Sequence, residues 1–155
     1  MTDTAPAPTR PAALIGWRLF SLLYDFLPVL ALWMVIGAAM VVLFTLAGHD
    51  THENIRPLTA WWFVEWALCW AVAGAYATLS WRRGGQTLGM RPWRLRVTSA
   101  DGGAPTTGAL WRRYAVGTLS LLLGGLGFWW AWFDRDRLTW HDRASGTRMV
   151  RMPKR

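Results

Sequence analysis

Three charged side chains lie inside or beside long apolar segments, where charge is unusual. Asp25 is the sole formal charge in residues 19–46, and Glu65 is the sole formal charge in residues 58–80. Arg18 precedes Asp25 by seven residues, so a helix would place both on one face, about 10 Å apart along its axis. An ionised group inside a membrane is costly and normally faces protein, water or a partner, which makes these positions candidates for moving protons or cations.

The surroundings of Asp25 suit a proton or a cation. Pro28 removes one helix hydrogen bond and leaves the carbonyl of Tyr24 free beside the carboxylate. The alternative is a structural ion pair that holds helices together near the membrane surface. Glu65 is expected near the opposite membrane surface from Asp25. Because the two carboxylates would then lie at different depths, they could be steps of one ion or proton path but not a paired acid and base. Glu65 could equally reach outward or accept a hydrogen bond from an indole.

The chain lacks the residue patterns of the common enzyme classes. Cys69 is its one cysteine and lies in an apolar segment without an obvious base. Residues 49–53 read His-Asp-Thr-His-Glu, which could hold a metal weakly but lacks a rigid frame and the usual ligand set. Phosphate loops, G-x-S-x-G and H-E-x-x-H motifs are missing from the sequence. We therefore expect no catalytic residues, no bound metal, no cofactor and no enzymatic activity.

The elements that must position these charges are hydrophobic segments of membrane-spanning length. Apolar types make up 53% of the 155 residues and charged types 17%, against about 25% charged in a typical soluble domain. Residues 19–46, 58–80 and 114–133 each reach the roughly 20 residues that a transmembrane helix needs. The pattern predicts an all-α membrane protein with two full transmembrane helices and a third hydrophobic segment. Thirteen tryptophans, many at segment edges, are typical of interfacial anchors.

Arginine and lysine predict the orientation. The first loop, residues 48–57, holds one arginine, whereas residues 81–113 hold seven. Because positive loops stay inside, we expect the N-terminus and the second loop to be cytoplasmic. The tail after Phe133 carries seven more positive charges, which conflicts with a full third crossing. The glycines of residues 124–127 could break the third segment, so we expect a broken, re-entrant or interfacial helix pair, with a plain third span as the alternative.

Smaller features complete the predicted architecture. Residues 93–98 and 147–152 alternate with a period of two and predict a small cytoplasmic β element. Residues 1–15, which include three prolines, are interpreted as a disordered tail, and residues 16–152 as a single membrane domain. The basic segments suit anionic lipid head groups at the cytoplasmic face; nucleic acid is not expected. Alanines repeating every four residues between Ala67 and Ala77 predict close helix packing on residues 37–39 or a dimer face.

Two glycine-containing turn motifs follow the second and third segments. Residues 85–89 read Gly-Gln-Thr-Leu-Gly, and residues 141–147 read His-Asp-Arg-Ala-Ser-Gly-Thr. Together with Arg18 and Asp25, and in this order between hydrophobic segments, they resemble the RDD family of small bacterial membrane proteins. The resemblance implies that the signature charges are Arg18, Asp25 and Asp142. It also implies that the characteristic turn residues are Gly85, Gln86, Thr87, Gly89, His141, Gly146 and Thr147.

What the resemblance implies is a multi-pass protein of the bacterial inner (plasma) membrane. Most members have no assigned activity, and some have been linked to sodium or potassium/proton antiport. Met90 and Pro92 depart from the basic and aliphatic residues usual after the glycine motif. If the third segment re-enters, Arg18 could lie between Asp25 and Asp142 near the cytoplasmic interface. Such a cluster would be either a fold-defining charge cluster or an ion-coupling site.

Two functions of different kinds remain open from the sequence. The first is a structural or accessory membrane protein, working as a homo-oligomer or within a larger membrane complex. The second is a cation/proton antiporter that uses Asp25 and Glu65, which would have to oligomerise because three segments enclose too little protein for a pathway. The first predicts that Asp25→Asn lowers folded yield without changing ion flux. The second predicts cation-dependent proton movement that Asp25→Asn abolishes while folded yield is kept.

Overall fold

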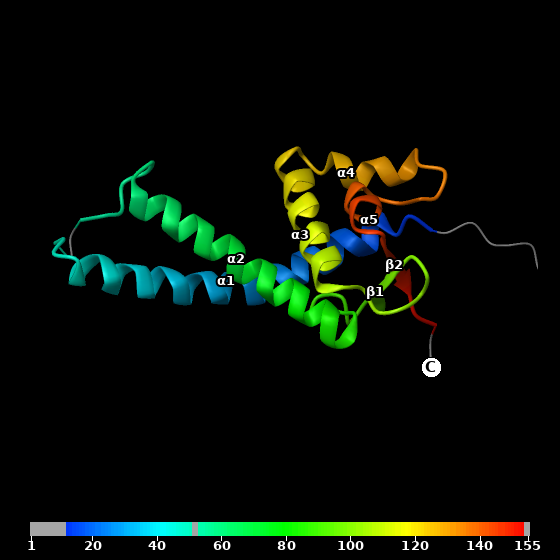
Figure 1. The fold of residues 1–155 in the computed structure, drawn as a ribbon, viewed down its shortest axis with the longest axis horizontal. Coiled ribbons are helices and arrows are strands. Elements are labelled where there is room, and N and C mark those ends of the chain that lie inside the picture. The colour runs from blue at the N-terminus through cyan, green and yellow to red at the C-terminus, as the bar shows by residue number, and fades with distance from the viewer. Residues whose placement is uncertain (1–11, 51–52, 154–155) are drawn as a thin grey trace, which may run out of the picture.

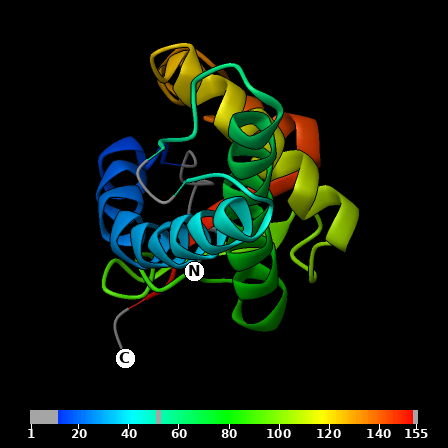
Figure 2. The ribbon, with the colours of Figure 1, turned by 90° about the vertical axis from the view of Figure 1, so that its left-hand side faces the viewer.

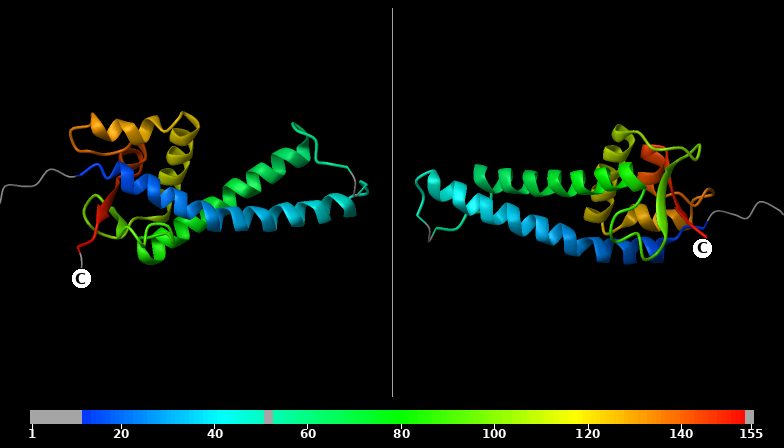
Figure 3. Two further views of the ribbon diagram at one scale, coloured as in Figure 1. Left: turned by 180° about the vertical axis from the view of Figure 1, so that it is seen from behind. Right: turned by 90° about the horizontal axis from the view of Figure 1, so that it is seen from below.

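Two long helices form a hairpin, and the rest of the chain gathers at one end of it. In the computed structural model, the described residues are 12–50 and 53–153. Helix α1 (Ile15–Leu46) and helix α2 (Ala60–Gly84) extend together along the long axis of the molecule (Figure 1). Residues 85–151, which we call the end unit, lie beside the first turns of α1 and the last turns of α2 (Figure 3).

Both hairpin helices are long and apolar enough to cross a membrane. Their outer surfaces are correspondingly apolar, with side chains such as Leu27 and Val35 more than 65% exposed. Thr59 caps the start of α2 by accepting a hydrogen bond from the Trp62 amide. The prediction of two candidate spanning helices is thus confirmed. Helix α1 begins at Ile15, the last residue assigned to the tail, while residues 1–11 of that tail lie outside the described residues.

The third hydrophobic segment is broken, as the glycines predicted. Helix α3 (Thr107–Leu122) is followed by α4 (Leu126–Trp129) and the short 3-10 helix η1 (Trp130–Trp132), with a bend of 108° between the two parts. Gly124 and Gly125 at the break have φ values of +68° and +80°, a region that favours glycine. Helix α3 runs across the long axis of the hairpin (Figures 1 and 2).

The small β element is also present. Strand β1 (Leu95–Ser99) pairs antiparallel with β2 (Thr147–Arg151), and helix α5 (Trp140–Ser145) leads directly into β2. The buried side chains of Leu95 and Val97 join Met90 and Leu110 in the hydrophobic core of the end unit. Because two strands are not stable alone in water, this packing explains how so small a sheet persists.

A small residue of α2 allows α3 to pack closely against it. A Cβ atom at Gly74 would overlap the rings of Trp111 and Tyr114 of α3. The alanine spacing predicted that this part of α2 packs on residues 37–39 or forms a dimer face. A methyl group at Gly37 would have Oε1 of Glu65 as its nearest neighbour, at 3.8 Å. Close approach of α2 therefore positions α3 against the hairpin.

Candidate functional site: a buried ion cluster and a separate carboxylate

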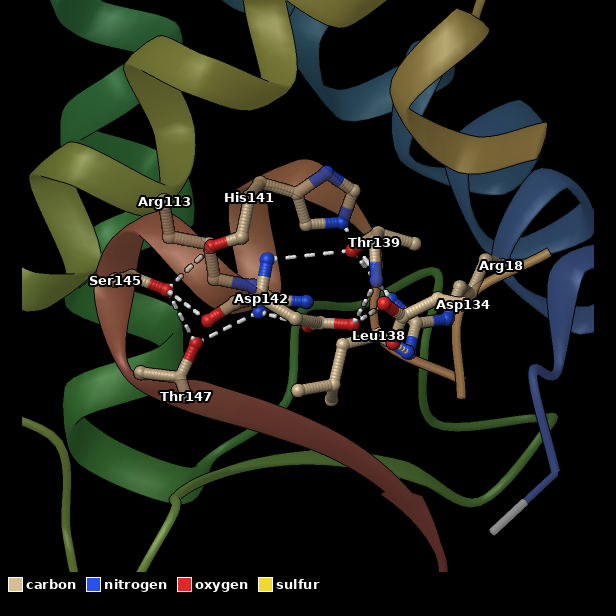
Figure 4. Close-up of polar contacts among 9 residues, drawn as sticks. All are labelled: Arg18, Arg113, Asp134, Leu138, Thr139, His141, Asp142, Ser145 and Thr147. Carbon is tan, nitrogen blue, oxygen red and sulfur yellow. Dashed lines mark hydrogen bonds and ion pairs between the residues drawn. The ribbon is translucent and has the colours of Figure 1, made fainter. Parts of the chain in front are cut away.

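Asp142 lies between two buried arginines. Its Oδ2 is 2.8 Å from Nη1 of Arg18, and its Oδ1 is 2.5 Å from Nη1 of Arg113. The side chains of all three residues are at most 2% exposed. We call them the Asp142 ion cluster (Figure 4). It joins the first turn of α1 to α3 and α5, so one carboxylate connects the hairpin to two helices of the end unit.

The start of α5 orients the Asp142 carboxylate. Thr139 accepts a hydrogen bond from the Asp142 amide through its side chain, and its own amide donates to Asp142 Oδ2, both at 3.2 Å. This reciprocal capping box fixes the third residue of the helix. Thr139 Oγ1 also accepts a hydrogen bond from Arg18 at 3.3 Å. The cap therefore holds both members of the ion pair in place.

The end of α5 supplies the remaining partners of Arg113. Gly146 ends the helix with φ +63°, and the next residue, Thr147, accepts a hydrogen bond from Nη1 of Arg113 at 2.7 Å. Ser145 Oγ lies 2.7 Å from Thr147 Oγ1 and donates to the carbonyl of His141. The motif of residues 141–147 thus forms a turn that surrounds Arg113 with acceptors.

A second ion pair holds the segment before α5. Arg143 Nη2 lies 2.6 Å from Oδ1 of Asp134, and Oδ2 of the same carboxylate accepts from the Leu138 amide at 2.9 Å. The Arg143 side chain is half exposed, so this pair contributes little free energy compared with the buried cluster. The pair and the Leu138 hydrogen bond connect residues 134–138, which precede the cap residue Thr139; Figure 4 draws Asp134, Leu138 and Thr139.

The electrostatics of the cluster keep Asp142 ionised. Burial alone raises the pKa of Asp142, but the charges of Arg113 and Arg18 and the hydrogen bond from Arg113 lower it by more, so its pKa lies below the usual range. Two arginines and one carboxylate leave an excess of one positive charge. Removing Asp142 would leave both buried arginines without a counter-charge, a kind of change that is typically destabilising by about 3–5 kcal/mol.

His141 adjoins the cluster as a neutral ring. Burial and the charge of Arg113 hold the pKa of His141 well below its ordinary value. Its Nε2 lies 3.5 Å from Nη1 of Arg18. The same Nη1 also lies 2.8 Å from Asp142 Oδ2 and 3.3 Å from Thr139 Oγ1, and these two acceptors account for both of its hydrogens. Nδ1 is buried and has no hydrogen-bond partner among the described residues, and the same is true of Nε of Arg18.

Asp25 belongs to a different set of contacts. Its Oδ1 accepts hydrogen bonds from Tyr76 Oη at 2.7 Å and from the Gly89 amide at 2.8 Å. Its Oδ2 accepts from Thr87 Oγ1 at 2.5 Å. No ion pair joins Asp25 to Arg18 within the part of the chain that the structure describes. The expected cluster of three signature charges is therefore wrong in this respect: Arg18 pairs with Asp142, while Asp25 ties α1 to α2 and to the following loop.

The first turn motif is built around Asp25. A Cβ at Gly89 would overlap the carbonyl oxygen of Ser21 and the Asp25 side chain, so the loop can approach α1 only with glycine there. Gly85 ends α2 in a left-handed conformation with φ +72°. Gln86 then donates a hydrogen bond to the carbonyl of Leu95 at 2.7 Å. Gly85, Gln86, Thr87 and Gly89 thus hold the loop that follows α2 in place against α1 and β1.

Glu65 is not brought near Asp25. It lies on α2 eleven residues before Tyr76, the residue that binds Asp25, a separation of about 16 Å along a helix. In the described ranges, no hydrogen bond or ion pair links the two carboxylates through intervening side chains. A path between Asp25 and Glu65 stays a prediction.

Sequence reasoning missed Arg113, which it counted only among the basic residues of the second loop. One signal was available. On α3 the buried residues are Ala109, Leu110, Arg113 and Ser120, a helical spacing that places the arginine on the apolar face. As for metals, no group of three or more His, Cys, Asp or Glu side chains able to hold an ion occurs among residues 12–50 and 53–153. Part of the His-containing segment, residues 51–52, lies outside those ranges.

Comparison with known proteins agrees with the motifs. Searches of curated proteins and of solved structures gave no match. The model of the RDD family matches residues 12–146, which include the first turn motif, residues 141–146 of the second, the Asp142 ion cluster and Asp25. The chain therefore belongs to the RDD family.

Proposed function

We propose that the protein is a structural or accessory protein of the bacterial inner membrane, working as a homo-oligomer or within a larger membrane complex. In this function the signature charges fasten the end unit to the membrane hairpin. The single observation that carries the proposal is the double pairing of Asp142 with Arg18 and Arg113. A carboxylate that couples ion movement must exchange its partners, whereas both oxygens of Asp142 are bound by arginines in a buried site.

The proposed orientation has the N-terminus and the end unit at the cytoplasmic face. The start of α1, the end of α2 and the sheet lie at one end of the molecule (Figure 3). Seven arginines between residues 81 and 113 therefore gather at the same end as those of β2, in keeping with the tendency of positive segments to remain inside. They suit anionic lipid head groups there. With α3 crossing the hairpin axis, the third segment is re-entrant or interfacial in this arrangement.

The exposed aromatic side chains of α4 and η1 support an interfacial position. Trp129, Trp130 and Trp132 are between 39% and 54% exposed, and Phe133 is 82% exposed. Indole rings favour the boundary between hydrocarbon and head groups. In this proposal they hold the broken segment at the membrane surface and so keep α5 close to the start of α1.

Paired substitutions test the structural role. Asp142→Asn removes the buried negative charge, while Asp136→Asn changes an aspartate that is 58% exposed and lies 3.4 Å from its arginine partner. We expect Asp142→Asn to reduce the yield of monodisperse protein strongly and Asp136→Asn to leave it unchanged. Equal yields for the two variants would contradict the proposal.

A second candidate function, cation/proton exchange, is favoured by one observation. Asp25 borders an internal cavity and has no cationic partner in the described part of the chain. Proton movement in inverted membrane vesicles on adding sodium or potassium distinguishes the two functions. The structural function predicts the same flux with the protein, with Asp25→Asn and with empty vesicles. Exchange predicts a flux that is present with the protein and lost in a folded Asp25→Asn variant.

A further inference from the structure

A cavity of about 320 Å³ lies where α1, α2 and α3 converge. Figure 2 looks along the hairpin toward this end of the molecule. Residues of α1 from Arg18 to Val29 line one side, and α2 and α3 supply the other walls. His141 of α5 and Phe128 of α4 close it toward the end unit. The volume is near the lower end of the range for small-molecule sites, about 300–1,000 Å³.

One part of the cavity wall belongs to the apolar outer surface of α1 and α3. Leu22, Phe26 and Leu121 all line the cavity and are 38–50% exposed on the outside. In a membrane, this surface would face lipid chains. The cavity is therefore accessible to an apolar chain from the bilayer.

The opposite end of the cavity is polar and positively charged. Arg18, Arg113 and His141 line it, each less than 5% exposed. Asp142 neutralises one of the two arginines, which leaves one positive charge in excess. Nε of Arg18, which is a donor, and Nδ1 of His141 are buried polar atoms without partners among the described residues. Buried polar groups are nearly always satisfied, so these two atoms point to a polar ligand group that the chain itself does not supply.

Gly117 of α3 lies opposite the unpartnered histidine nitrogen. A Cβ atom at Gly117 would have Nδ1 of His141 as its neighbour, at 4.0 Å. Gly117 also lines the cavity. Because Gly117 has no side chain, nothing on α3 at this point fills the part of the cavity nearest this nitrogen.

Among the described residues that line the cavity, the one acidic side chain is Asp25. Its two oxygens accept three hydrogen bonds, from Tyr76, Thr87 and the Gly89 amide. It lies about 10 Å from Arg18 along α1, so its charge is compensated by local donors and does not occupy the positive end.

We propose that this cavity binds one long-chain fatty acid, with the carboxylate at Arg18 and His141 and the chain directed toward Phe26 and Leu121. A singly charged head group matches the single excess positive charge. The small volume favours one acyl chain over the two of a phospholipid. The proposal requires that the hairpin spans the membrane, as proposed above: the polar end then faces the head-group region and the apolar end faces the membrane interior, the orientation of a lipid in the cytoplasmic leaflet.

Ligand chemistry on the unaltered protein gives the first test. The full chain, purified in a non-ionic detergent, is titrated with palmitic acid, with hexadecanol and with phosphatidylglycerol, and bound species are counted by native mass spectrometry. We expect saturable binding of one palmitate per chain and at least about tenfold weaker binding of the alcohol, since the charged head group carries the hydrogen bonds. Equal binding of acid and alcohol, or preferential binding of phosphatidylglycerol, would overturn the proposal.

Matched glycine variants on α3 localise the binding. Gly117→Leu places a side chain in the cavity, whereas Gly108→Leu adds the same side chain where nothing lies within 4 Å. His141→Phe keeps a ring at the cavity end and removes Nδ1. We expect Gly117→Leu to abolish palmitate binding, His141→Phe to weaken it about tenfold or more, and Gly108→Leu to retain it. Palmitate binding by a folded Gly117→Leu protein at the affinity of the unaltered chain would overturn the assignment.

Discussion

Nη1 of Arg18 and Oδ2 of Asp142 lie 2.8 Å apart, although Arg18 is in the first turn of α1 and Asp142 is more than 120 residues later in the chain. This ion pair links the first helix to the last one. It brings α5 against α1, and Arg113 on α3 completes the same buried cluster. The attachment of the end unit to α1 therefore includes one carboxylate with two arginine partners, in addition to the contacts of Asp25 with the loop after α2.

Arg113 and its sequence neighbour Arg112 offer a matched comparison. Arg113→Gln removes a buried partner of Asp142 and Thr147, whereas Arg112 is exposed. We expect Arg113→Gln to lower the free energy of unfolding by about 1–3 kcal/mol, because Asp142 and Thr147 lose a charged donor while Asp142 keeps Arg18, and Arg112→Gln to change it by no more than about 0.5 kcal/mol. Unfolding in detergent, followed by circular dichroism, measures both. Similar stability of the two variants would show that the cluster is not a stabilising feature.

Gly89 should tolerate no side chain. A methyl group there would overlap the Ser21 carbonyl and the Asp25 carboxylate, forcing the loop away from α1 and breaking its hydrogen bonds to Asp25. We expect Gly89→Ala to reduce folded yield severalfold. Gly108→Ala is the control, since a methyl group at that position would have nothing within 4 Å. A helical Gly→Ala change at an open position is stabilising by roughly 0.5–1 kcal/mol, so loss of yield in both variants would point to a cause other than the Asp25 contact.

The lowered pKa of His141 predicts that the protein loses stability in weakly acidic solution. Burial and the charge of Arg113 hold its pKa well below the ordinary value in the folded protein, whereas the unfolded chain takes up a proton near pH 6.5. Between these pKa values the unfolded state binds more protons, so stability falls as pH falls below about 6.5. We expect this slope to disappear in His141→Phe. A slope that persists between pH 7 and 5 would assign it to other groups.

Asp142 affects the free energy of unfolding at a lower pH than His141 does. Its pKa in the folded state is below the usual range, and the unfolded value is about 3.9. Its contribution is fully present above the unfolded pKa and is lost as pH falls through the folded pKa. We expect the acid unfolding limb below about pH 4 to be shallower in Asp142→Asn, compared at matched stability by adjusting denaturant. An identical acid limb would indicate that Asp142 is not paired in the folded state.

Local sequence pattern predicted the elements well because their causes are local. The apolar lengths of α1 and α2, Gly124 and Gly125 at the break, and the alternation in the two strands each act within a few residues. The ion partners could not be deduced in the same way. Arg18 shares a helical face with Asp25, which favoured pairing them, but the turn around Gly89 supplies Asp25 with hydrogen-bond donors from the loop. That leaves Arg18 to bind Asp142.

The most direct test of the central claim is a pair of double-mutant cycles that share Arg18→Met. In the first, Arg18→Met is combined with Asp142→Asn, and in the second with Asp25→Asn. The free energy of unfolding is measured for each single and double variant. The structure predicts a coupling of about 2 kcal/mol or more for Arg18 with Asp142 and additivity within about 0.5 kcal/mol for Arg18 with Asp25. Strong coupling to Asp25 and additivity with Asp142 would contradict the account.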